Sequence, residues 1–226
     1  MLASMSALVE VHDVSKTYRL GELPVAALAG VSLRLEAGEF VAVAGPSGSG
    51  KTTLLNLIGC LDTPTAGEIQ IDGQSVSRLS SGARADLRAR KLGFIFQTFN
   101  LIPVLTAFEN VEYPLLLTRR RGDLRQRVRR ALEQVGLAER ARHRPPELSG
   151  GQQQRVAIAR ALVTDPVLVL ADEPTANLDS RTGHEIVELM RQLNRDRGTT
   201  FLFSTHDARI MTVADRVLEI SDGRFR

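Results

Sequence analysis

The 226-residue sequence lacks the features that mark secreted or membrane-spanning chains. Cys60 is its one cysteine, so no internal disulfide can form and a reducing compartment is expected, with Cys60 buried as a small apolar side chain. The longest apolar runs have about five residues, far fewer than the ~20 of a membrane-spanning helix. The first residues, "MLASMSALVEV", also lack the basic segment of a signal peptide. These absences predict a cytosolic chain with no membrane span.

Aromatic residues and excess charge are scarce as well. The sequence has no tryptophan, two tyrosines and a formal net charge of +3. Basic residues gather in "RRRGDLRQRVRR", 119–130, but no aromatic residue there offers the stacking surface that single-stranded nucleic acid uses. No nucleic-acid partner is therefore expected. A solvated helix face is the first interpretation of this run, and contact with acidic lipid headgroups or an acidic partner stays open.

Continuous apolar runs predict a parallel sheet. Three of them lack the alternation of a strand with one wet face, which is typical of strands covered on both faces: 40–44, 167–171 and 200–203. A further strand is predicted within 91–97. Shorter alternating pieces, "ALVEVHDV" near the start and "GEIQIDG" at 67–73, predict a small antiparallel sheet beside the first. Between Gln97 and about residue 164 the spacing of apolar residues is helical, as in "TAFENVEYPLLL" and "LRQRVRRALEQVGL".

A glycine-rich loop follows the strand at 40–44 and opens a helix. "GPSGSGKTT", 45–53, matches the G-x-x-x-x-G-K-[ST] pattern, whose glycines let backbone N–H groups surround a β-phosphate. Lys51 would contact the β- and γ-phosphates, Thr52 would bind Mg²⁺ and Thr53 would contact the α-phosphate. The residues assigned to nucleotide binding are Gly45, Pro46, Ser47, Gly48, Ser49, Gly50, Lys51, Thr52 and Thr53.

These patterns together predict an α/β fold of the P-loop NTPase type. Its ATP-binding core, with a mainly parallel sheet and a small N-terminal antiparallel β-subdomain, would comprise residues 1–97 and 165–226. An inserted α-helical subdomain would comprise residues 98–164.

Acidic and polar side chains follow the predicted parallel strands, where α/β proteins bind their ligands. Asp172 would hold Mg²⁺ through water, and Glu173 would be the general base for an attacking water. His206 ends another strand and is placed to contact the γ-phosphate. Gln97 ends a further strand, and its amide oxygen could reach Mg²⁺ or the attacking water; the residues alone support a structural role for Gln97 equally well.

Taken in order, these motifs resemble those of the ATP-binding-cassette ATPases, the nucleotide-binding subunits of ABC transporters. The resemblance covers nearly the whole chain and is carried by the phosphate loop 45–53, Gln97, "LSGGQ" at 148–152, "VLVLADE" at 167–173, "NLD" at 177–179 and His206. It implies ATP and Mg²⁺ as cofactors, with Gln97, Glu173 and His206 as catalytic residues and Thr52, Gln97 and Asp172 as metal ligands.

The resemblance also implies a homodimer with shared ATP sites. In this family, "LSGGQ" of one subunit covers the γ-phosphate bound by the other, so these residues would serve a second copy of the chain: Ser149, Gly150, Gly151 and Gln152. Asp179 resembles the residue that lines the dimer seam. Tyr18 resembles the aromatic residue that stacks on adenine, although a Tyr near a strand also suits the core.

The resemblance further implies a separate membrane permease, which would keep the chain at the cytoplasmic face of the inner membrane. The permease's coupling helix is expected near residues 97–117. Most of the apolar residues at the start of this segment are predicted to lie in the core, and the others to form the docking groove: Phe99, Leu101, Ile102, Val104 and Leu105.

"FQTFNLIPVLTAFENVEYPL" resembles the lipoprotein-releasing, macrolide-exporting and cell-division-type cassettes. A cell-division-type or a soluble, non-transport cassette is the alternative. A GTPase is disfavoured because the guanine-reading N/T-K-x-D motif is missing, and a small-molecule kinase would not explain "LSGGQ".

Overall fold

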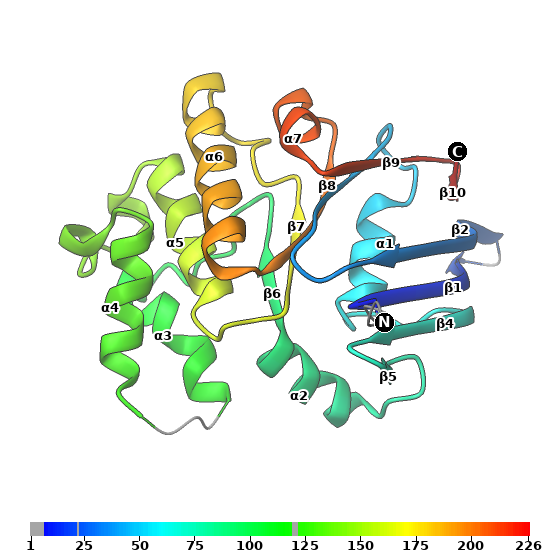
Figure 1. Cartoon of the computed structure of the whole chain (residues 1–226), viewed down its shortest axis with the longest axis horizontal. Coiled ribbons are helices and arrows are strands. Elements are labelled where there is room, and N and C mark those ends of the chain that lie inside the picture. The colour runs from blue at the N-terminus through cyan, green and yellow to red at the C-terminus, as the bar shows by residue number, and fades with distance from the viewer. Residues whose placement is uncertain (1–6, 22, 119–121) are drawn as a thin grey trace, which may run out of the picture.

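The computed structural model describes residues 7–21, 23–118 and 122–226. Two β-sheets lie side by side, with most helices packed on the side of the larger sheet away from the smaller one (Figure 1). The larger sheet has six strands in the order β10-β9-β3-β8-β7-β6. Its strands are β3 (Phe40–Ala44), β6 (Leu92–Ile95), β7 (Leu168–Asp172), β8 (Thr200–Thr205), β9 (Arg216–Ser221) and β10 (Arg224–Phe225).

The predicted parallel sheet is confirmed. Neighbouring strands are parallel throughout the larger sheet except for β10, which runs antiparallel to β9. All residues of β3 and β8 are buried, which explains their unbroken apolar runs. Phe40 and Ala42 belong to a core shared with the helices, whereas Val41 and Val43 belong to a second core shared with the smaller sheet. The larger sheet is therefore the middle layer of the molecule.

The smaller sheet is antiparallel, as predicted, with the order β2-β1-β4-β5. Its strands are β1 (Val9–Leu20), β2 (Leu23–Leu35), β4 (Ala66–Ile71) and β5 (Gln74–Ser75). Parts of β1 and β4 were predicted from the sequence, but β2 was not. The first four residues of β2 are exposed, so no alternation of buried and exposed positions marks the start of that strand.

Helices cover both faces of the larger sheet. On the side of the smaller sheet, α1 (Lys51–Ile58) contributes Leu54 and Ile58 to the second core. The opposite side carries α3 (Ala107–Leu117), α4 (Leu124–Gln134), α5 (Gly150–Leu162) and α6 (Ser180–Arg197), drawn from green to orange in Figure 1. The remaining helices are α2 (Ser81–Lys91), α7 (Ala208–Val213) and the short 3₁₀ turns η1 (Ala138–Arg140) and η2 (Pro145–Glu147).

The helices predicted between residues 98 and 164 are confirmed by α3, α4 and α5. Thr106 caps α3 in a reciprocal capping box with Glu109, and Asp123 caps α4 by accepting from the Gln126 N–H. α5 packs against α3 and also against strand β6. It thus connects the helical layer to the edge of the parallel sheet. Cys60 is buried, as predicted, and its pKa is raised by that burial.

Candidate active site

The loop between β3 and α1 has glycine where a side chain would not fit. A Cβ on Gly45 would lie 2.2 Å from the backbone oxygen of Ile220, and one on Gly50 would lie 2.5 Å from that of Ala27. Gly50 also has a φ of +103°, and Gly48 has a φ of +77° in open space. The close approach of the Ile220 backbone requires glycine at position 45, and the left-handed backbone favours glycine at positions 48 and 50.

A cavity of about 630 Å³ opens above this loop. It gathers the loop with side chains from the ends of three parallel strands, and its lining residues are Ala27, Gly45, Pro46, Ser47, Gly48, Gly50, Lys51, Thr52, Thr53, Gln97, Glu173, Ala176 and His206. Ser49 is buried and lies outside the lining. Ala27 and Ala176 were not predicted, since a small apolar side chain carries no chemical signal. The cavity brings the predicted loop and all three predicted catalytic residues together.

Lys51 is held inside the loop. Its ammonium donates to the backbone oxygens of Gly45 at 2.7 Å and Pro46 at 2.9 Å, and the residue is 7% exposed. These two carbonyls aim the charge at the cavity that the loop surrounds. An ammonium in this position is suited to bind phosphate oxygens.

Thr52 lines the cavity, and Asp172, which lies outside the lining, contacts its hydroxyl. The Thr52 hydroxyl lies 3.0 Å and 3.2 Å from the two carboxylate oxygens of Asp172, and the Ser204 hydroxyl also donates to Asp172. The Asp172 carboxylate, the Thr52 hydroxyl and the amide of Gln97, which also lines the cavity, are hard oxygen donors of the kind that Mg²⁺ takes, together with waters and substrate phosphates. Among the described residues no three His, Cys, Asp or Glu side chains form a metal-binding cluster. The donors present therefore fit a phosphate-bound Mg²⁺ and not an all-protein metal site.

Glu173 and His206 are paired beside the loop. His206 Nδ1 lies 2.9 Å from Glu173 Oε1, with the histidine side chain 73% exposed and the glutamate side chain 16% exposed. Glu173 has a φ of +46°, which is unusual for a residue with a side chain. Its N–H donates to the backbone oxygen of Ser204 at 2.9 Å. The next strand of the sheet thus fixes the backbone that carries this carboxylate.

Gln97 lies two residues beyond β6, and its backbone oxygen accepts a 2.9 Å hydrogen bond from the Asn177 side chain. The segment that follows is held by Arg160 of α5, which donates to the backbone oxygens of Phe99 and Asn100. Burial lowers the pKa of Arg160 to about 10. A half-buried guanidinium thus connects the segment after Gln97 to α5.

A second set of free N–H groups lies at the start of α5. Ser149 is the N-cap: its hydroxyl accepts from the Gln152 N–H at 3.3 Å, and the Gln152 side chain accepts from the Ser149 N–H at 2.9 Å. Gly150 and Gly151 are the first helical residues, so no preceding helical turn offers carbonyl oxygens to accept from their N–H groups. A Cβ on Gly151 would lie 2.4 Å from the Thr182 methyl group. None of these four residues lines the phosphate cavity of its own chain.

Asp179 and Tyr18 are both engaged within the chain. Asp179 caps α6 by accepting from the N–H groups of Arg181 and Thr182, and its bonds to Thr182 lower the pKa of its carboxyl group. Tyr18 donates its hydroxyl to Asp62 at 2.9 Å, and its pKa is raised by burial and by that bond. Tyr18 does not line the cavity. Each of these two predicted site residues thus makes a hydrogen bond within its own chain.

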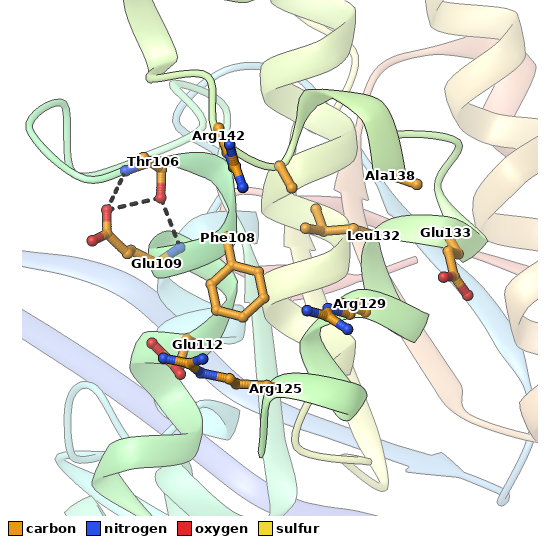
Figure 2. A pocket seen from close by; sticks show the side chains of 11 residues that line it. Thr106, Phe108, Glu109, Glu112, Arg125, Arg129, Leu132, Glu133, Ala138 and Arg142 are labelled. Carbon is orange, nitrogen blue, oxygen red and sulfur yellow. Dashed lines mark hydrogen bonds between the residues drawn. The ribbon is translucent and has the colours of Figure 1, made fainter. Parts of the chain in front are cut away.

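The arginine-rich run does not form one basic face. Arg127 pairs with Asp165, whereas Arg125 and Arg129 line a separate cavity of about 540 Å³ between α3, α4 and η1 (Figure 2). Glu112 and Glu133 also line that cavity, so its walls carry both positive and negative charges. Residues 119–121 of the run lie outside the described part of the chain.

An apolar groove of about 470 Å³ lies between α2, β6, α3 and α5. Its lining residues include Leu61, Phe94, Phe96, Pro114 and Leu117. The groove falls partly within the predicted docking segment 97–117, through Pro114 and Leu117.

The prediction that most of the five apolar residues at the start of that segment lie in the core was only partly right, and their part in permease docking stays a prediction. None of them lines the groove and none is fully buried; they are Phe99, Leu101, Ile102, Val104 and Leu105. Leu101 packs against the core, and Val104 is 72% exposed. The loop before α3 leaves Phe99, Leu101, Ile102 and Leu105 half-buried and exposes Val104.

Comparison with known proteins agrees with this geometry. Residues 28–176 match the family described as ABC transporter. An uncharacterized ABC transporter ATP-binding protein of Thermotoga maritima is 51% identical over 98% of this chain and 94% of its own length. The macrolide export ATP-binding/permease protein MacB of Syntrophobacter fumaroxidans is 49% identical over 96% of this chain, which spans 31% of MacB.

A solved structure shares the whole architecture. It is the dimeric post-hydrolysis state of the ATP-binding cassette MJ0796 bound to ADP and Pi, with a TM-score of 0.89, 46% identity and 96% of each chain covered. The chain belongs to the ABC transporter family as an ATP-binding cassette, and within it to the subgroup that resembles the macrolide-export cassettes.

Proposed function

We propose that this chain hydrolyses ATP as a head-to-tail homodimer and thereby drives a membrane permease of the lipoprotein-release or macrolide-export type. The observation that carries the proposal is the separation of two phosphate-binding features. The cavity contains Lys51, Glu173 and His206 but none of residues 149–152. A second chain must bring its own Ser149 and Gly151 to complete the site. The solved dimers of the MJ0796 cassette, one with ADP and Pi, support this arrangement.

Five side chains in or beside the cavity, and His206 with them, have distinct tasks in the proposed reaction. Lys51 binds the β- and γ-phosphates, and Thr52, Asp172 and Gln97 would hold Mg²⁺, which neutralises phosphate charge when bound. Glu173 accepts a proton from the attacking water. His206, 2.9 Å from that carboxylate, orients it and faces the γ-phosphate.

The partner's contribution makes the dimer depend on one phosphate group. The hydroxyl of Ser149 and the N–H of Gly151 bind the γ-phosphate held by the other chain, and the positive end of α5 adds to the attraction. Asp179 lies at the seam between the chains and Tyr18 stacks on adenine. Once the γ-phosphate has left, these contacts have no ligand and the dimer opens.

The apolar groove is the proposed docking site of the permease. Leu117 and Leu61 are 59% and 48% exposed at its edge, and Arg160 lines it while holding the segment after Gln97. A coupling helix bound there would therefore act on the helical part, residues 98–164, relative to the core formed by 1–97 and 165–226. In the part of the chain that the structure describes, no helix is long and apolar enough to cross a membrane. The permease would keep the chain at the cytoplasmic face.

The variant Glu173→Gln tests the proposal. It keeps the size of the side chain but cannot take a proton, so it should bind ATP, hydrolyse it at under about 1% of the parental rate and accumulate as a dimer. The exposed Glu188→Gln on α6 is the matched control and should behave as the parent. Hydrolysis at the parental rate by Glu173→Gln would refute the assignment of the base.

The transport part of the proposal needs a separate experiment. The chain is purified from detergent-solubilised membranes, and an integral membrane protein should copurify with it. Leu117→Glu, which places a charge in the groove, should abolish that copurification without changing ATP binding. Copurification of ribosomes or DNA in place of a membrane protein would contradict a role in transport.

A further inference from the structure

Gln154 is a buried polar side chain that the proposed reaction does not use. It lies on α5, beyond the residues that face the partner, and is 0% exposed. Its amide Nε2 donates to the backbone oxygen of Pro174 at 2.7 Å, while its Oε1 has no hydrogen-bond partner among the described residues. Burial of an amide with one unpaired oxygen is costly. An apolar side chain of equal size would pack there at less cost, so stability alone does not explain this residue.

The acceptor of this hydrogen bond is next to the catalytic carboxylate. Pro174 follows Glu173, whose left-handed backbone has a φ of +46°. Such a conformation persists only where its surroundings hold it. Ser204 holds the Glu173 N–H on one side, and the N–H of Ala176 donates to the Glu173 carbonyl at 3.2 Å. The bond from Gln154 is the contact that α5 adds to this strained turn.

We propose that Gln154 is a positioning residue that couples α5 to the catalytic glutamate of its own chain. The proposal rests on the function proposed above. Ser149 and Gly151 at the start of α5 bind the nucleotide of the partner, and Gln154, on the same rigid helix, holds the turn of Glu173. Engagement of one ATP site is thereby transmitted through a single helix to the base of the other site.

Substitution of two adjacent glutamines tests this role. Gln154→Met removes the donor but keeps the length and helix propensity of the side chain. Gln153→Met is the matched control, because Gln153 Nε2 also donates to a backbone oxygen, that of Leu148 at 3.1 Å, away from Glu173. We expect Gln154→Met to lower kcat by roughly tenfold to a hundredfold, as misplacement of a reacting group does, with the Kd for ATP changed by less than about twofold. Gln153→Met should keep the parental kcat.

Amide hydrogen exchange separates positioning from a general loss of structure. In Gln154→Met the N–H of Glu173 should exchange faster, whereas core amides of β3 and β8 should exchange as in the parent. If Gln154→Met does not fold, Gln154→Leu provides the same test, since it is also apolar and of similar volume. Hydrolysis by the parent and by Gln153→Met shows that the ATPase part of the proposed function holds. A parental kcat in Gln154→Met or Gln154→Leu would then overturn the role of Gln154 alone, as would equal acceleration of all amides.

Discussion

Asp207 makes the stability of the fold depend on pH in the acid range, and the structure predicts how large this dependence is. Its carboxylate accepts from the Thr175 hydroxyl at 2.6 Å and from the Arg209 guanidinium at 2.6–2.9 Å, and its side chain is 12% exposed. Burial opposes ionisation, but the hydrogen bonds from Arg209 and Thr175 outweigh it and lower the pKa of Asp207 from 3.8 to about 2. Asp207 also follows His206, and Thr175 is two residues from Glu173, so this cluster supports the active site.

The lowered pKa corresponds to about 2 kcal/mol of stability at pH 7. Because the pKa in the folded state lies below that of the unfolded chain, this stability is complete above about pH 4 and is lost as the pH falls toward 2. Asp207→Asn keeps the shape of the side chain but has no charge to stabilise. It should therefore be about 2 kcal/mol less stable than the parent at pH 7, and about half of that difference should disappear at pH 3.

Urea unfolding of parent and variant at several pH values measures this difference. The other carboxyl groups titrate in both proteins and cancel in the comparison. Asp86→Asn, which removes one partner of an exposed ion pair with Arg90, is the control and should change stability little at any pH. A stability difference between parent and Asp207→Asn that stays constant from pH 7 to pH 3 would refute the reasoning.

Three further predictions concern nucleotide binding and coupling. Lys51→Ala should lose ATP binding measured by calorimetry, because the ammonium is the charge inside the loop; tight binding would argue against the assignment. Tyr18→Leu should weaken ATP and GTP binding alike by about 0.5–1.5 kcal/mol, the contribution of one aromatic stack, and an ATP-specific loss would show that the base is read in another way. Arg160→Met should lower the permease-stimulated ATPase rate more than the basal rate, because it frees the left-handed residues Phe99 and Asn100 from α5; equal loss of both rates would contradict that role.

Local chemistry made much of the site predictable from the sequence. The phosphate loop has glycine where the backbone is left-handed or crowded. Asp172 ends, and Glu173 follows, a strand that is apolar because both of its faces are covered. Parallel strands end at one edge of the sheet, which brings His206 and Gln97 to the same cavity. Each of these features is encoded by a short stretch of sequence, and the parallel order of the strands brings the stretches together.

Features assembled from distant segments were not predictable in this way. The apolar groove joins Leu61, Phe94 and Leu117, which are separated along the chain and carry no shared motif. The apolar residues after Gln97 were predicted to lie mostly in the core, but the loop before α3 leaves them half-buried and exposes Val104. Gln154 was missed because a glutamine on a helix is usually solvated, and only the packing of α5 on the turn after Glu173 buries it.

The sharing of each ATP site between two chains is the central claim, and complementation tests it most directly. Ser149→Asp keeps a good N-cap but places a negative charge against the partner's γ-phosphate, and Glu173→Gln lacks the base. Each variant alone should be inactive. Mixed in equal amounts, they form heterodimers in which one site has an intact Glu173 facing an intact Ser149, so ATP hydrolysis should reappear. A mixture as inactive as its two components would contradict the shared site.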